Sequence, residues 1–164
     1  KEGILPAKFF NEHGIDAFVL HYRLNNHQQE GHHYPAQYND LTTAIRIVRS
    51  RAAEWHIDPE KFSSRPSFSI LIYPVISMDT LFGHRYSREM LLGRTPAEAL
   101  VADLSTEKRV TAETPPVFLI HADDDKAVPP QNSIAFYEAL KKNKVPASLY
   151  IYDHGGHGFG NAPR

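Results

Sequence analysis

Four short apolar segments alternate with stretches of helical periodicity along this 164-residue chain, and this alternation most limits its fold. Each segment is rich in β-branched, leucine or aromatic side chains, as expected of a buried strand. They cover residues 15–20, 68–73, 117–121 and 148–152. Strands that alternate with helices usually pair in parallel and are covered by helices on both faces. The sequence therefore predicts an α/β fold with a mostly parallel sheet.

Apolar residues at three- and four-residue steps predict the helices. One helix is expected over residues 5–13, ahead of Gly14. A longer one begins near Pro35, a residue that suits a first helical turn. Its apolar stripe consists of Leu41, Ala44, Ile45, Val48, Ala52 and Trp55. Another helix is expected around residues 134–140, and the more polar stretch 77–114 predicts short helices in an excursion over the sheet.

Composition excludes several classes of protein. Eighteen Lys and Arg residues nearly balance nineteen Asp and Glu residues, so no basic field exists to bind nucleic acid. No apolar run reaches the ~20 residues of a membrane span, which predicts a soluble chain. The lack of cysteine excludes disulfides and thiolate chemistry. Location stays open, with secretion or a bacterial periplasm as one alternative, and so does the oligomeric state.

Two loops carry candidate catalytic groups. The third predicted strand runs into His121-Ala122-Asp123-Asp124-Asp125, and the fourth into Asp153-His154-Gly155-Gly156-His157-Gly158. In open α/β sheets, reactive groups gather at the carboxyl ends of the strands. A carboxylate on one loop can bind the Nδ1–H of an imidazole on the other and stabilise the imidazolium formed in proton transfer. The order of acid before histidine is also that of α/β-hydrolases.

These loops, together with Thr114-Pro115-Pro116 before the third strand, resemble those of bacterial acetyl xylan esterase-type carbohydrate esterases, in the α/β-hydrolase superfamily. The similarity continues through Tyr22-Arg23-Leu24, Ile57-Asp58-Pro59 and residues 71–77. It implies a single α/β-hydrolase domain over residues 1–164, with residues 77–114 as an excursion or cap on the active-site side. The Asp-x-x-Val-Pro spacing implies that Asp125 is the triad acid, and the Gly-His-Gly-Phe-Gly context that His157 is the base.

The chain departs from this pattern at the nucleophile. The family places a strand and a Gly-x-Ser-x-Gly elbow after the Asp-Pro-x-Lys-Phe stretch, but here Phe62 is followed directly by Ser63. A segment of roughly 30 residues is therefore expected to be missing between residues 62 and 63. The family's oxyanion-hole loop would also precede residue 1. In addition, His56 stands where the resemblance leads us to expect glycine.

The remaining candidates have simpler interpretations. Ser63, Ser64, Ser67 and Ser69 lack the flanking glycines of an elbow, so none is a candidate nucleophile. Asp123, Asp124 and His154 are expected to be structural or to lie at the rim of the site. His27, His32 and His33 are expected to form a solvated loop, so no metal is predicted. Tyr22 and Tyr73 are expected to pack as half-buried aromatic residues, although both could line a pocket.

The resemblance implies a serine-type carboxylic ester hydrolase, with no cofactor, acting on short acyl esters such as acetylated sugars or xylan. Its substrate would be a small-molecule or polysaccharide ester. A peptidase or a dienelactone-type hydrolase is an alternative, because such enzymes share the late Asp and His loops. Another alternative is a continuous, non-catalytic binding module on a hydrolase scaffold.

Overall fold

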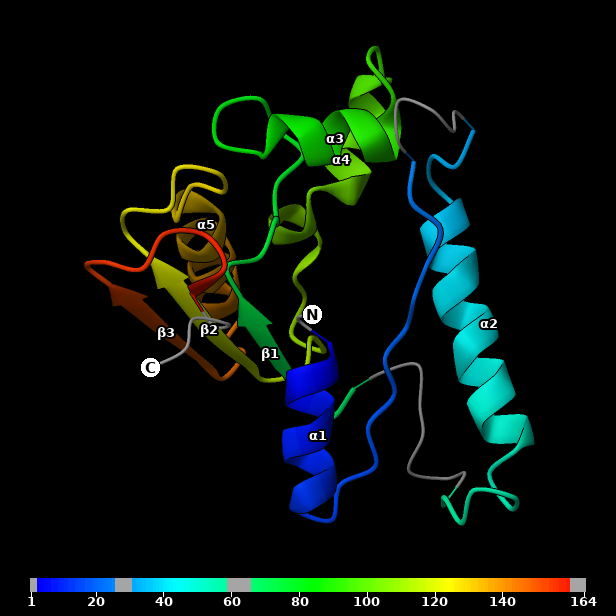
Figure 1. Ribbon diagram of the computed structural model, residues 1–164. Helices are drawn as coiled ribbons and strands as arrows, with labels where there is room; N and C mark the ends of the chain where they lie inside the picture. The colour runs from blue at the N-terminus through cyan, green and yellow to red at the C-terminus, as the bar shows by residue number, and fades with distance from the viewer. Residues whose placement is uncertain (1–2, 26–30, 59–65, 160–164) are drawn as a thin grey trace. The chain divides into compact units, whose positions relative to one another are not determined.

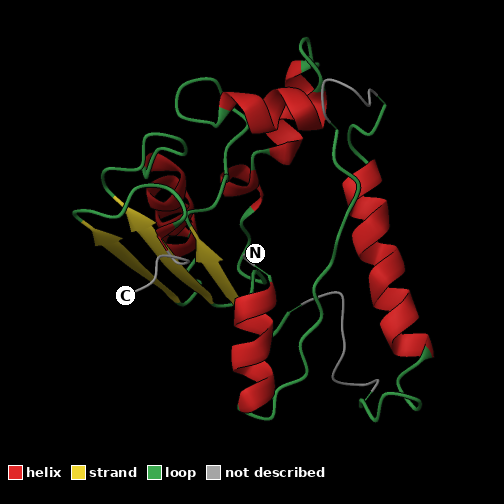
Figure 2. Cartoon of the chain, viewed as in Figure 1, coloured by secondary structure: helices red, strands yellow, loops and turns green. Residues whose placement is uncertain are grey.

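The computed structural model describes residues 3–25, 31–58 and 66–159, and the chain divides into two compact units, residues 1–64 and 65–164. The second unit contains a three-stranded sheet, β1 (Ser69–Ile72), β2 (Val117–Ala122) and β3 (Ala147–Tyr152), in the order β1-β2-β3 (Figures 1 and 2). Both pairings are parallel. The predictions of three strands and of a parallel sheet are confirmed.

The connections between these strands contain the helices of the second unit. Between β1 and β2 lie α3 (Arg85–Leu92), α4 (Glu98–Leu104) and a 3-10 turn (Thr106–Arg109). This confirms the short helices predicted for residues 77–114. Helix α5 (Gln131–Lys142) links β2 to β3, so a helix separates two parallel neighbours, as a parallel pair requires.

One face of the sheet packs against α5 and forms the core. Leu119 of β2 and Leu140 of α5 are completely buried. Their cluster also contains Ile76, Val117, Phe136 and Val145. The opposite side chains of the strands remain 37–54% exposed, and they include Ile70, Ile72, Phe118, Tyr150 and Tyr152. The core of this unit therefore lies between the sheet and α5, and it fixes the carboxyl ends of β2 and β3.

The described residues of the first unit form the helices α1 (Ile4–Glu12) and α2 (Ala36–Ser50), and both were predicted. Val48 and Ala52 of the expected stripe are buried, whereas Leu41 is 47% exposed. The helix ends at Ser50, so Ala52 and Trp55 lie in turns beyond it. His56 has φ +56°, so this histidine adopts the left-handed conformation for which glycine was expected.

The strand predicted at residues 15–20 is wrong. These residues follow α1 without forming strand structure, and Ile15, Phe18, Val19 and Leu20 are 37–53% exposed. A strand needs a neighbour to pair its backbone N–H and C=O groups, and the described part of the chain pairs no strand with this segment. β-Propensity alone therefore did not determine the structure here.

Other predictions about chain organisation remain predictions. The expected gap between residues 62 and 63 lies outside the described residues, as do Ser63 and Ser64. The single domain over residues 1–164 and the cap role of residues 77–114 also remain predictions. Among the described residues, no helix has the length and apolar character needed to cross a membrane.

Candidate active site

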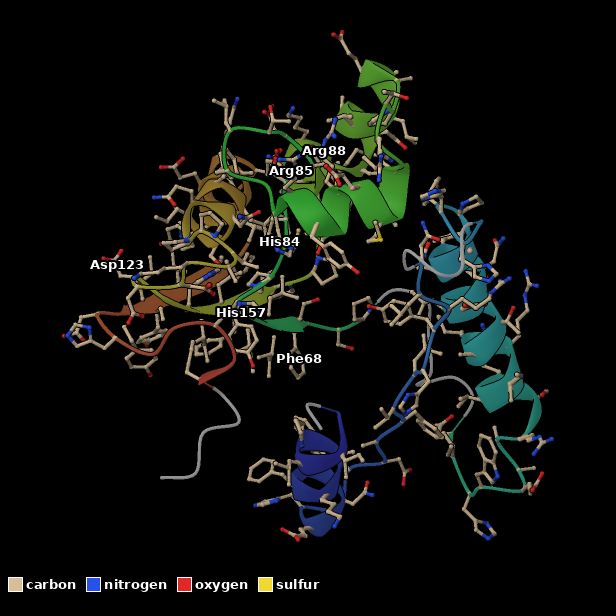
Figure 3. The ribbon with its side chains drawn as sticks, turned by 45° about the horizontal axis from the view of Figure 1, so that its top comes forward. Phe68, His84, Arg85, Arg88, Asp123 and His157 are labelled. Carbon is tan, nitrogen blue, oxygen red and sulfur yellow. The ribbon has the colours of Figure 1, made fainter. Side chains whose placement is uncertain are left out.

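Asp125 and His157 meet at the carboxyl ends of β2 and β3. Because these strands are parallel neighbours, their following loops leave the same edge of the sheet. The Nδ1–H of His157 donates to Oδ2 of Asp125 at 2.8 Å. Figure 3 shows His157 on the loop after β3, with Asp123 lying apart from it. The hydrogen-bonded contact expected between Asp125 and His157 is therefore present.

The carboxylate of Asp125 is held in its ionised form. Its side chain is fully buried, and its Oδ1 accepts hydrogen bonds from the backbone N–H groups of Ala127 and Val128, both at 2.9 Å. Burial raises the pKa of Asp125, but these two bonds and the bond from His157 outweigh burial and leave the pKa below its ordinary value. A buried anion is thus available to stabilise a positive charge on His157.

A second histidine, His121, lies behind the carboxylate and is fully buried. Its Nε2 donates to the carbonyl oxygen of Val128 at 2.9 Å and lies 3.4 Å from Oδ2 of Asp125. Its Nδ1 is 2.7 Å from Oγ of Ser133, which is also fully buried. With Nε2 protonated, Nδ1 accepts from the Ser133 hydroxyl. His121 therefore connects the Asp125 loop to α5. The sequence analysis did not single out this role, and the signal that could have indicated it is the position of His121 four residues before Asp125.

The loop that carries His157 depends on glycine and on Asp124. Gly156 and Gly158 have φ of +61° and +86°, values that favour glycine. Oδ1 of Asp124 accepts a hydrogen bond from the backbone N–H of Gly156 at 2.7 Å. Asp124 therefore binds the backbone of the loop, whereas Asp125 binds the imidazole. The side chain of His157 is 39% exposed, and its Nε2 has no partner among the described residues. This nitrogen is accessible for proton transfer.

Of the other candidates in the second unit, Tyr73 contacts His157, whereas His154 lies beside Asp153 and Asp124. His154 is 85% exposed and lies 3.7 Å from Asp153 and 4.0 Å from Asp124. Tyr73 is half-buried, as predicted, and its ring packs against His157 with centroids 4.8 Å apart. Tyr22 is 50% exposed, so about half of this residue is covered, and it is more open than Tyr73.

The histidine-rich loop of the first unit is only partly described. The ring of His33 lies 3.1 Å from the side-chain nitrogen of Asn25, and the carbonyl oxygen of His32 accepts from Gln37 at 2.6 Å. His27 lies outside the described residues. Over residues 3–25, 31–58 and 66–159, no group of three His, Cys, Asp or Glu residues is arranged to hold a metal ion.

The described residues supply an acid–base pair without a serine nucleophile beside it. Ser69 lies within β1, where its N–H donates to the carbonyl oxygen of Pro116. Chemically, the pair can take a proton at Nε2 of His157, stabilise the resulting imidazolium through Asp125, and return the proton to a leaving group. It requires a hydroxyl nucleophile from elsewhere in the protein.

Two curated proteins resemble almost the whole chain. An acetylxylan esterase of Xylanibacter ruminicola is 34% identical over 97% of this chain and 37% of its own length. Endo-1,4-beta-xylanase B of Butyrivibrio fibrisolvens is 30% identical over 96% of this chain and 29% of its own length. The chain thus spans about a third of each relative. The resemblance to carbohydrate esterases found in the sequence is confirmed.

Among solved structures, an acetyl ester-xyloside bifunctional hydrolase from Caldicellulosiruptor lactoaceticus is 35% identical, with a TM-score of 0.82. The match covers 95% of this chain and 67% of that one, and it confirms the α/β-hydrolase fold. The model of the prolyl oligopeptidase family matches residues 67–164, which include all three strands and both catalytic-type loops. On this evidence, the chain belongs to the prolyl oligopeptidase family of α/β-hydrolases.

Proposed function

We propose that the protein containing this chain is a serine-type carboxylic ester hydrolase that cleaves short acyl esters, such as acetyl groups on xylan or related sugars. His157 acts as general base and then general acid, and Asp125 orients it and stabilises its charge. The observation that carries the proposal is the 2.8 Å hydrogen bond between these two side chains, with the His157 side chain 39% exposed.

The choice of ester chemistry rests on the relatives. The acetylxylan esterase and the acetyl ester-xyloside hydrolase both align with at least 95% of this chain. A peptidase is the second candidate, because the matching family is the prolyl oligopeptidase family. The dienelactone-type hydrolase has no comparable observation in its favour. Acetate release from acetylated xylan, measured beside cleavage of a prolyl p-nitroanilide, separates the two main candidates.

We further propose that the nucleophile lies in a segment that follows Phe62 in the intact protein. The alignment with the acetylxylan esterase runs over 184 positions and that with the xylanase over 190, whereas the chain has 164 residues. Each relative therefore contains positions that face a gap in this chain. A missing strand, elbow and helix of roughly 30 residues fits a difference of this size.

The test is hydrolysis of p-nitrophenyl acetate by the intact protein, including whatever its gene encodes between Phe62 and Ser63. We expect His157→Ala to lower kcat by about 10³-fold or more, because no other group replaces the base. His154→Ala is the matched control and should stay within about twofold, since surface changes away from the site have small effects. Turnover no faster than that of His157→Ala would refute the proposal.

A further inference from the structure

Tyr73 has a left-handed backbone conformation, which is rare for a non-glycine residue. It follows β1 directly and has φ +41°, in the left-handed region that aromatic residues rarely enter. Its N–H nevertheless donates to the carbonyl oxygen of Ile120 at 2.8 Å, which continues the hydrogen bonding between β1 and β2. Pro74 comes next in the chain. Such strained residues persist only where surrounding contacts hold them, and they cluster at functional sites.

The ring of Tyr73 is directed at the loop that carries His157. It meets the imidazole edge-to-face, with centroids 4.8 Å apart and planes at 60°. It also meets Phe159 edge-to-face, with centroids 5.3 Å apart. Aromatic pairs at such distances and angles attract one another beyond simple burial. Tyr73 therefore connects the end of β1 to the loop after β3, across the intervening strand β2.

Phe159 is itself held by contacts with Gly155 and Tyr152. A Cβ added at Gly155 would lie 3.1 Å from the Phe159 ring and 3.3 Å from Cβ of Ala122, so the ring packs closely over this glycine. Phe159 also contacts the ring of Tyr152, at the end of β3. The support behind Tyr73 is consequently made of packed side chains and strand ends, which can hold the ring of Tyr73 against His157.

The hydrogen bond to Asp125 alone leaves the imidazole able to pivot. One bond from Nδ1 to Oδ2 fixes a single atom of the ring, and 39% of the side chain is open to solvent. A second contact on the ring is needed to fix its plane. Among the described residues, the aromatic contact recorded for His157 is the one with Tyr73.

We propose that Tyr73 is a positioning residue: its ring, aimed by the left-handed backbone at the end of β1, holds the His157 imidazole with Nδ1 on Asp125 and Nε2 toward the site. The inference deepens the proposed function, in which Nε2 transfers the proton. The required property is the aromatic ring. The orientation of the imidazole is a physical property that exists with or without esterase activity.

The first arm of the test is nuclear magnetic resonance of the 164-residue chain with ¹⁵N-labelled histidine, at about pH 8, where an ordinary histidine is neutral. We expect the wild type to show one tautomer of His157, protonated at Nδ1. Tyr73→Asn removes the ring while keeping a residue that tolerates positive φ, so the chain should still fold. It should give a mixture of the two tautomers.

Two further variants make the result specific. Tyr73→Phe keeps the ring and should keep the single tautomer. Tyr150→Asn is the matched control, because this tyrosine also belongs to the sheet unit but packs on Phe118 instead of His157. It should leave the His157 signals unchanged. Unchanged His157 signals in folded Tyr73→Asn would overturn the inference, as would equal effects of Tyr73→Asn and Tyr150→Asn.

The second arm uses the intact protein. There Tyr73→Asn should lower kcat about tenfold to a hundredfold with little change in KM, because a misplaced base costs rate rather than binding. Tyr73→Phe should restore kcat. If the tautomer changes but the intact protein has no esterase activity, the proposed function fails and the positioning role stands. If esterase activity is present but the tautomer is insensitive to the ring, only the positioning role fails.

Discussion

Asp125 shows how one buried carboxylate serves both structure and chemistry. Its Oδ1 holds the backbone of residues 127 and 128, while its Oδ2 faces His157. One oxygen therefore has the structural role common for an aspartate before a helix, which is to bind backbone N–H groups in a turn. The other oxygen binds the histidine. In the sequence, the resemblance to the family's Asp-x-x-Val-Pro motif distinguished Asp125 from Asp123 and Asp124, and in the structure Asp125 binds the His157 ring.

The lowered pKa of Asp125 predicts a stability effect in acid. Since the folded-state pKa lies below the unfolded value of ~3.9, folding favours the carboxylate. This stabilisation is complete above the unfolded pKa and is lost as the pH falls through the folded pKa. We expect Asp125→Asn to lower the free energy of unfolding at pH 7 by about 1–2 kcal/mol, because charge-assisted hydrogen bonds are lost. Below about pH 4 the difference from wild type should shrink.

Urea denaturation of wild type and Asp125→Asn at several pH values measures this. The control is Asp153→Asn, whose carboxylate is 91% exposed and should show no comparable pH dependence. A difference between wild type and Asp125→Asn that stays constant from neutral to strongly acidic pH would contradict the assigned pKa direction.

At the scale of elements, buried side-chain hydrogen bonds join α5 to the segment after β1, and apolar periodicity does not reveal them. Asn132, in the first turn of α5, is fully buried. Its Oδ1 accepts from the backbone N–H groups of Ile76 and Ser77 at 3.0 Å, and its Nδ2 donates to the carbonyl oxygens of Phe82 and Pro129. One side chain thus joins the segment after β1 to the start of α5. The sequence indicated the helix but gave no sign of this connection.

Replacing Asn132 should be costly. Asn132→Leu has similar volume but leaves the N–H groups of Ile76 and Ser77 and the carbonyl oxygen of Phe82 without their side-chain partner, so we expect a loss of about 3 kcal/mol in the free energy of unfolding. Thermal and urea denaturation measure it. Gln131→Leu is the matched control: it is the adjacent residue of the same helix, is exposed, and should change stability by less than about 0.5 kcal/mol. Similar losses in the two variants would show that burial of the amide is unimportant.

For the whole molecule, the proposed function depends on the nucleophile segment that we propose between residues 62 and 63. We expect a fluorophosphonate probe to label the intact protein at a serine, because such probes react with activated serine nucleophiles. The 164-residue chain, with a mass of 18.6 kDa, should remain unlabelled, although it contains Asp125 and His157. Mass spectrometry of both after labelling is the measurement. An unlabelled intact protein of 18.6 kDa would favour the alternative of a non-catalytic module.

The apolar periodicity of the sequence determined which segments of the second unit become strands and helices. Strands at residues 69–72, 117–122 and 147–152 and the helix α5 were predictable because each buries a regular apolar pattern against the others. The same reasoning failed at residues 15–20, since an apolar segment becomes a strand only where a neighbouring strand pairs with its backbone. Local composition carries no information about that neighbour.

For Asp125 and His157 too, the sequence determined one part of the arrangement and the tertiary structure the other. The positions of the two loops indicated an acid and a histidine that meet, because residues at the ends of parallel strands lie at one edge of the sheet. The family resemblance then implied that these residues are Asp125 and His157. Only the tertiary structure decided which atoms meet, and that His121, Tyr73 and Asn132 support them. The contacts of Tyr73 and Asn132 join residues far apart in sequence, and Tyr73 also has a backbone φ that its residue type disfavours, so packing and not local preference causes them. His121 is different, because it lies only four residues before Asp125.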